Sequence, residues 1–170
     1  MKTTLNKIRE HAPCTDGWEK LLKHLGKTRP DDEPLSLLTI LDSNGIEDTI
    51  WCFRAVEGYD KEKRLFAVWC ARQVQHLMAD QRSIDALDVA ERYANGLATD
   101  DELSAAWAAA RAAGAAAREA AGAAAWAAGE ADREAAGAAA WAAGVAEVAR
   151  EAAREGQETK LREILREMEA

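Results

Sequence analysis

The sequence predicts an all-α fold, with about six short helices followed by a long helical segment rich in Ala, Gly and Trp. Two observations carry this prediction. Of the 50 residues from 101 to 150, 27 are Ala, the residue with the highest helix propensity. In the first hundred residues, apolar side chains recur at helical spacing between capping residues, Gly and Pro. We therefore expect a multi-helix bundle.

The first four helices follow from their end signals. The expected ranges are 4–11, 15–25, 32–44 and 46–56. Thr3 or Thr4 caps the first helix, and Thr15 or Asp16 caps the second. In the third, Pro34 is expected in the first turn, where a missing N–H is tolerated.

Two further helices complete the predicted bundle. In the range 61–79, the seven residues 65–71 are all apolar, which predicts a central helix packed on several sides. The sixth helix begins at Ser83 and ends at Ala94, before Asn95-Gly96. Thr99 and Glu102 then form a capping box, which predicts the start of the long Ala-rich helical segment.

The Ala-rich segment contains an internal duplication. Residues 114–128 and 129–143 differ at two positions only. Within each copy a Gly is followed four residues later by Arg or Trp. The gap that the Gly leaves and the large side chain therefore lie on the same face of the helix. Gly is unfavourable inside a helix by about 1 kcal/mol relative to Ala, so its regular recurrence favours close packing.

We expect this segment to break near Gly129–Asp132 and to form a helical hairpin on the first six helices. The alternative is a protruding rod that forms a homodimer. An amphipathic helix over 158–170 is expected to close the chain. The predicted organisation is thus a helical bundle core at 1–98 and an Ala-rich repeat with its closing helix at 99–170, packed together as one domain.

The charge balance argues against a nucleic-acid-binding protein. Lys and Arg number 22 against 30 Asp and Glu, giving a net charge of −8, whereas nucleic-acid binding draws on clustered positive charge. No stretch has the about 20 apolar residues that a membrane helix needs, and the N-terminus has no apolar run typical of a secretion signal. We expect a cytoplasmic protein without nucleic-acid or membrane partners.

No constellation of catalytic or metal-binding residues is visible. The three Cys residues have no C-x-x-C spacing, and no Gly-rich phosphate loop is present, so we expect neither metal nor cofactor. Cys70 and His76 lie six residues apart on the fifth expected helix, where their side chains diverge. An enzyme that uses these two residues is therefore an alternative and not the main prediction.

Candidate partner-binding residues lie in two places. The fifth expected helix carries polar side chains beside a Trp, and the repeat carries two further Trp residues. The candidates are Trp69, Arg72, Gln73, Gln75, His76, Trp126 and Trp141. Trp and Arg are enriched in binding hot spots. An internal hydrogen-bond network for the polar group and core positions for the two repeat Trp residues are the alternative interpretations.

Three stretches together resemble a known family. They are Ile50–Gly58, Arg64–Met78 and Asp85–Gly96, followed by the Ala-, Trp- and Arg-rich tract. Over residues 37–150 the chain resembles bacterial and phage immunity proteins, specifically the all-α immunity family numbered five in polymorphic toxin systems. The resemblance implies a cytoplasmic protein that neutralises a toxin by binding it, and it brings no catalytic residues.

The sequence therefore predicts a non-enzymatic protein-binding inhibitor, with toxin immunity as its expected form. An alternative is a phage inhibitor of a host defence nuclease complex, similar to an anti-CRISPR protein. The acidic balance favours a basic partner through electrostatic steering.

Overall fold

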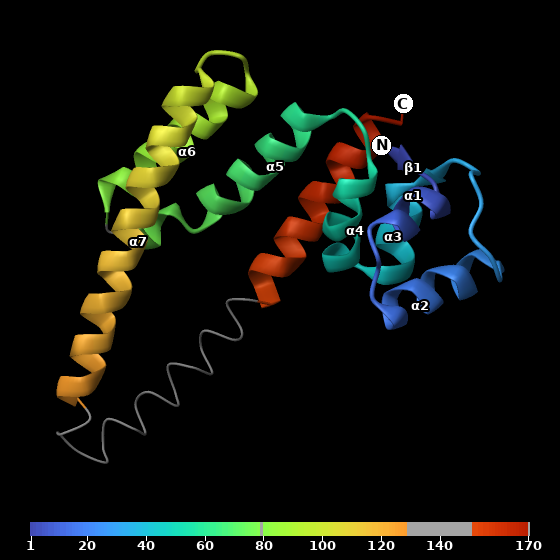
Figure 1. The fold of residues 1–170 in the computed structure, drawn as a ribbon, viewed down its shortest axis with the longest axis horizontal. Helices are drawn as coiled ribbons and strands as arrows, with labels where there is room; N and C mark the ends of the chain where they lie inside the picture. The colour runs from blue at the N-terminus through green and yellow to red at the C-terminus, as the bar shows by residue number, and fades with distance from the viewer. Residues whose placement is uncertain (79, 129–150, 170) are drawn as a thin grey trace. The chain divides into compact units, whose positions relative to one another are not determined.

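The computed structural model describes residues 1–78, 80–128 and 151–169, and for residue 77 and residues 116–128 it describes the backbone alone. Within these ranges the predicted all-α fold is confirmed, accompanied by one two-stranded sheet (Figure 1). The chain divides into unit 1, Met1–Lys63 with Glu155–Ala170, and unit 2, Arg64–Arg154. The expected ranges were 1–98 and 99–170; in the structure, residues 64–98 are grouped with the start of the Ala-rich segment, and residues from 155 onward are grouped with residues 1–63.

Unit 1 is built from short elements. In chain order they are β1 (Lys2–Thr3), α1 (Leu5–Glu10), α2 (Thr15–Leu25), β2 (Leu35–Ser36), α3 (Leu37–Asn44), α4 (Ile46–Cys52) and the 3-10 helix η1 (Phe53–Ala55). Thr4 caps α1, as expected, by accepting a hydrogen bond from the Lys7 N–H at 3.2 Å. Gly26 ends α2 in the left-handed conformation that the sequence predicts.

The small sheet was not expected from the sequence. β1 pairs antiparallel with β2, and Thr3 lies opposite Leu35. The expected helix start around Pro34 is wrong, because Leu35 and Ser36 are extended and Ser36 Oγ caps α3 by accepting from the Leu38 N–H at 3.0 Å. A strand of two residues is too short to show an alternating pattern.

The core of unit 1 is apolar with two buried hydroxyl groups. Its buried side chains include Leu5, Ile8, Leu21, Leu37, Ile40, Leu41, Ile46, Cys52 and Val56. Thr3 donates a hydrogen bond to the Ala55 carbonyl at 2.5 Å, and Thr49 donates to the Gly45 carbonyl at 2.8 Å. Both buried hydroxyl groups are therefore satisfied, as burial requires.

The chain is helical again from 151 to 167, and this closing helix shows the expected amphipathic pattern. Leu161 and Leu165 are 0% exposed. On the neighbouring face, Arg162 forms an ion pair with Asp42 of α3. The end of the chain therefore completes the core of unit 1.

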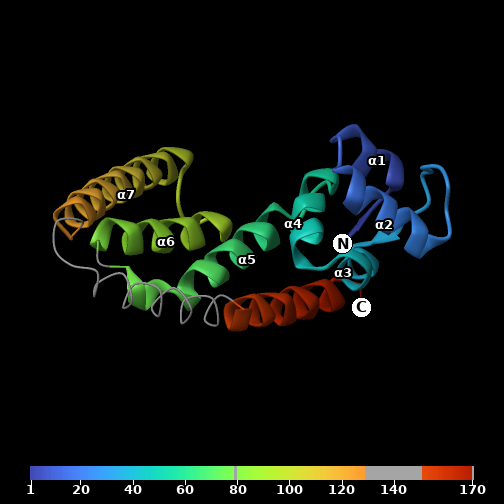
Figure 2. The ribbon, with the colours of Figure 1, turned by 90° about the horizontal axis from the view of Figure 1, so that it is seen from below.

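Unit 2 is helical in the residues that the structure describes. α5 (Asp60–Gln73) crosses the unit boundary, and η2 (Gln75–Leu77), α6 (Gln81–Ala94) and α7 (Asp100–Ala128) follow. α6 and α7 lie side by side as a helical hairpin (Figures 1 and 2). Gly96 adopts φ +73° at their turn, as its place after α6 predicts. No helix of the described ranges is long and apolar enough to cross a membrane.

α5 differs from the predicted central helix. Phe66 and Val68 are buried, whereas Ala67 between them is exposed, so the helix is not packed on all sides. α5 also ends at Gln73, earlier than the expected residue 79, and a 3-10 turn follows.

The capping box at the start of α7 is confirmed. The Glu102 N–H donates to Thr99 Oγ1 at 3.2 Å, and Glu102 Oε2 accepts from the Thr99 N–H at 2.7 Å. The first repeat copy, 114–128, lies within α7. The second copy, with the expected break at Gly129–Asp132, lies outside the described residues. The choice between hairpin and rod therefore stays a prediction.

Candidate functional site

The most prominent apolar hollow lies in unit 2, between α5, α6 and α7, and we call it the groove. Its volume is about 510 Å³. α5 contributes Arg64, Ala67, Val68 and Ala71; α6 contributes Ser83, Ala86, Leu87 and Ala90; α7 contributes Leu103, Trp107, Ala110, Arg111 and Gly114. On α5 and α6 the lining follows the spacing i, i+3, i+4, i+7, which places it on one face of each helix.

The groove exists because its walls are made of small side chains. Six lining residues are Ala or Gly: Ala67, Ala71, Ala86, Ala90, Ala110 and Gly114. Neighbouring helix axes pack at about 8–10 Å, and space between them stays open where side chains are too short to fill it. The small residues that α5, α6 and α7 each turn toward this space therefore leave the hollow between the three helices.

Trp107 is the large side chain of the groove. Its residue surface is 58% exposed, although burial of an indole is strongly favourable. Trp107 is not among the partner-binding residues that the sequence predicts. A signal was present, because Leu103, Trp107, Ala110 and Gly114 recur at i, i+4, i+7 and i+11 and so share one face of α7.

The groove carries positive charge in an acidic protein. Arg64 and Arg111 are the charged residues that line it, whereas the whole chain has a net charge of −8. The Arg64 guanidinium lies 4.7 Å from the centroid of the Tyr93 ring, a cation–π geometry that orients it. In the described part of the chain no carboxylate pairs with Arg64 or Arg111.

The candidate residues at the end of α5 divide into two groups. Arg72 forms ion pairs with Asp88 at 2.6 Å and with Glu91 at 2.8 Å, and it donates to Gln75 Oε1 at 2.9 Å. The hydrogen bonds that Arg72 donates to Glu91 and to Asp88 raise its pKa. Arg72 thus connects the end of α5 to α6, and Gln75 accepts a hydrogen bond from it. These contacts agree with the alternative interpretation of an internal hydrogen-bond network for these two residues.

The other candidates are less constrained. Gln73 is exposed and donates to the Trp69 carbonyl at 3.2 Å, while Trp69 itself is half-buried. His76 is exposed on η2. The backbone of Trp126 lies in α7, and its side chain and all of Trp141 lie outside the described residues. A partner-binding role for these residues stays a prediction.

Cys52 and Cys70 have environments that disfavour nucleophilic chemistry. Burial raises the pKa of the Cys70 thiol, and it raises the pKa of Cys52 to about 12. A reactive cysteine needs the opposite direction of shift. Cys70 lies in α5 and His76 in η2, so the two residues do not share a helix as expected. In the described ranges no group of three or more His, Cys, Asp or Glu side chains is arranged to hold a metal ion.

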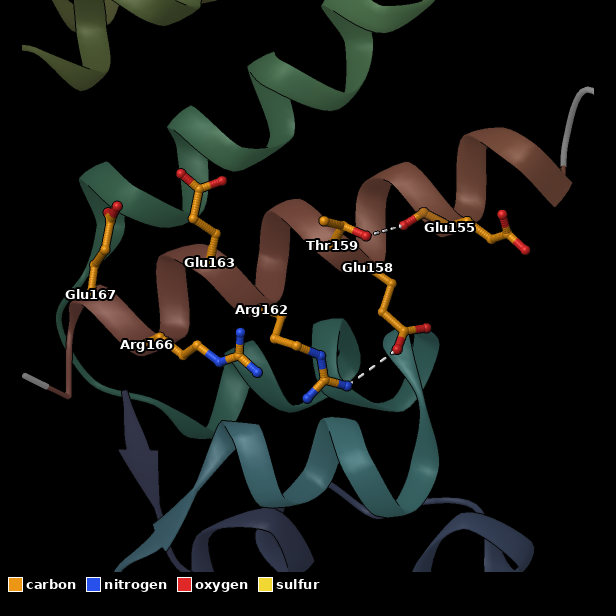
Figure 3. Close-up of a pocket in the computed structure, with 7 residues that line it drawn as sticks. All are labelled: Glu155, Glu158, Thr159, Arg162, Glu163, Arg166 and Glu167. Carbon is orange, nitrogen blue, oxygen red and sulfur yellow. Dashed lines mark hydrogen bonds and ion pairs between the residues drawn. The ribbon is translucent and has the colours of Figure 1, made fainter.

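Two other hollows differ from the groove. One, of about 590 Å³, lies on the closing helix and is lined by Glu155, Glu158, Thr159, Arg162, Glu163, Arg166 and Glu167 (Figure 3). Arg162 pairs with Glu158 at 3.3 Å, and Thr159 donates to the Glu155 carbonyl at 2.9 Å. A single helix face of mixed, partly paired charge is typical of a solvated surface. The other hollow, beside Cys14 and Cys52, has about 120 Å³ and is too small for an ordinary ligand.

The described residues form an all-α protein with an open, mainly apolar groove. Comparison of the chain with protein-family models, curated proteins and solved structures gives no match. The resemblance to immunity proteins therefore stays an expectation from the sequence.

Proposed function

We propose that this protein is a non-enzymatic inhibitor that acts by binding another protein through the groove. The observation that carries the proposal is the exposed indole of Trp107 in the open, apolar groove. Exposed apolar surface of this kind marks interaction sites, and Trp is the residue most enriched among binding hot spots. Toxin neutralisation is the particular form that the sequence resemblance favours.

A protein partner fits the groove better than a small substrate does. Small-molecule sites are concave and bury about 70–90% of the ligand surface, whereas Arg64, Ala67, Trp107 and Arg111 on the groove walls are all exposed. The raised pKa of Cys70 also gives the enzyme alternative no support.

The experiment is affinity capture from cells of the source organism, with the full chain and two variants. Trp107→Ser removes the indole from the groove. Leu97→Ser is the matched control, because Leu97 is 68% exposed in the α6–α7 turn and does not line the groove. We expect one protein to be captured by the wild type and by Leu97→Ser, and lost with Trp107→Ser. Equal capture by all three chains would contradict the proposal.

Inhibition is tested on the captured protein. The wild type is expected to inhibit its activity, and the double variant Cys70→Ala/His76→Ala is expected to inhibit equally well. Loss of inhibition in this double variant, with capture unchanged, would favour the enzyme alternative.

A further inference from the structure

The shape and charge of the groove restrict which part of a partner protein it can bind. This inference rests on the proposed function. Its floor is apolar, with buried Val68 and half-buried Leu87. Its α7 wall extends from Leu103 to Gly114, which corresponds to about 16 Å, or three helical turns. This is the length over which an amphipathic helix presents anchors at i, i+3 or i+4 and i+7 to a groove.

The small wall residues favour a helix as occupant. Ala67, Ala71 and Ala90 project only methyl groups into the groove. A helix that inserts there can approach the backbones of α5 and α6 closely, while its larger apolar side chains pack against Trp107 and Leu103.

The two arginines of the groove favour a bound segment that carries negative charge. Arg64 lies beside Tyr93, which is near the C-terminal end of α6. Because α6 and α7 are antiparallel, this end of α6 lies near the start of α7 (Figure 1). Arg111 is eight residues beyond Leu103 in α7, so the two arginines lie toward opposite ends of the groove. Neither pairs with a carboxylate of the described residues. Two cations that border an apolar channel complement carboxylates on the margins of an amphipathic helix.

We propose that the groove binds one amphipathic α-helix of the partner, with Asp or Glu side chains flanking its apolar face and pairing with Arg64 and Arg111. The net charge of −8 does not oppose this, because charges more than about 10 Å apart are largely screened at physiological salt.

The experiment is a selection for binding to the full chain from a displayed library of helical peptides of about 18 residues, a length at which isolated helices become stable. We expect selected peptides to carry apolar residues at helical spacing with Asp or Glu at their margins. Their affinity is expected to fall about tenfold in Arg64→Glu/Arg111→Glu. Lys analogues of the same peptides are expected to gain affinity for this variant.

The matched control is Arg9→Glu/Arg29→Glu, which makes the same charge change at two exposed positions of unit 1 and is expected to leave peptide affinity unchanged. Circular dichroism checks that each variant is folded. If Arg64→Glu/Arg111→Glu fails to fold, Arg64→Gln/Arg111→Gln replaces it, with a smaller loss expected and no gain for Lys peptides.

Several outcomes overturn this inference. They are the selection of basic or uncharged peptides, no selected binder, displacement of the peptides by a fatty acid, and self-association of the wild type through the groove. If Trp107→Ser abolishes binding while the arginine variants do not, the groove binds protein but the acidic helix is wrong. If Trp107→Ser also has no effect, the proposed function fails with it.

Discussion

Gly17 shows how a single hydrogen atom in place of a side chain supports unit 1. A Cβ at this position would lie 2.7 Å from Asp48 Oδ2 and 3.1 Å from the Cys14 sulfur. The same Asp48 oxygen accepts from Asn44 Nδ2 at 2.7 Å, and Asn44 Nδ2 also donates to the Gly17 carbonyl at 2.8 Å. Any side chain at residue 17 therefore displaces a hydrogen-bonded carboxylate that links α2, α3 and α4.

We predict that Gly17→Ala destabilises the protein by about 1 kcal/mol, since overpacking costs about 1–3 kcal/mol and the gain in helix propensity offsets part of it. Gly156→Ala is the matched control, because Gly156 lies in the closing helix with nothing within 4 Å of its added Cβ. It is expected to stabilise by about 0.5–1 kcal/mol. Urea unfolding of both variants measures the difference, and equal effects would contradict the crowding at residue 17.

The cysteines give a second prediction at this scale. Cys14 is exposed, whereas Cys52 is buried with its pKa raised to about 12. At pH 8 the thiolate fraction of Cys52 is therefore about 1 in 10,000, and the thiolate is the reactive form. We expect iodoacetamide to modify Cys14 in the folded protein and Cys52 only after unfolding, with peptide mass spectrometry as readout. Modification of Cys52 at the rate of Cys14 would show that the α4 core opens readily.

At the scale of elements, helix ends are where the sequence was most informative. The Thr4 cap, the Gly26 stop and the Thr99–Glu102 box depend on residues a few positions apart, so the sequence alone predicts them. The strand pair Thr3–Leu35 depends on residues far apart in the chain. The groove depends on how three helices pack, and for this reason the exposed Trp107 was not distinguished from the other Trp residues.

The pairing of Arg72 with Asp88 and Glu91 illustrates the same limit. A polar group on an apolar helix is evident from the sequence, but the partners of Arg72 lie on the next helix and are not predictable from local spacing. Local signals thus predicted most elements, whereas the candidate site arises from tertiary packing.

The capping box gives a prediction at the element scale. Thr99→Ala removes the acceptor for the Glu102 N–H, and loss of such a cap costs about 1 kcal/mol. We expect lower helicity of α7 by circular dichroism and earlier urea unfolding. Ser104→Ala, at an exposed position two residues beyond the box in α7, is the control and is expected to have little effect. A similar change in both variants would contradict the role of the cap.

The same box predicts a pH dependence. Hydrogen bonds from the Thr99 N–H, then from the Thr99 hydroxyl, and from Arg92 lower the pKa of Glu102. A lowered folded-state pKa means that this stabilisation is fully present above the ordinary pKa of glutamate and is lost as the pH falls through the folded-state value. Glu102→Gln is therefore expected to weaken the acid dependence of stability, measured as urea midpoints between neutral pH and pH 3. If the urea midpoint of Glu102→Gln fell with decreasing pH as steeply as that of the wild type, the role of the Glu102 carboxylate would be contradicted.

At the scale of the whole molecule, unit 1 is discontinuous in sequence, because Glu155–Ala170 joins residues 1–63 across the whole of unit 2. Two fully buried leucines, Leu161 and Leu165, and the Arg162–Asp42 ion pair hold the two segments together. The ion pair is partly exposed and contributes little, so the buried apolar side chains supply most of the stabilisation.

We therefore expect Leu161→Ala and Leu165→Ala each to destabilise the protein by about 2–5 kcal/mol, as is typical of a leucine removed from a core. Arg162→Ala is expected to cost less than about 1 kcal/mol. Urea unfolding followed by circular dichroism measures these values, and the fluorescence of Trp18 and Trp51 in unit 1, read in variants with the other Trp residues replaced, reports which unit unfolds. If Leu161→Ala left that unit 1 signal unchanged, residues 155–170 would not be part of its core. Because the groove residues all lie in unit 2, peptide binding at the groove is expected to survive these leucine substitutions under conditions where unit 2 stays folded.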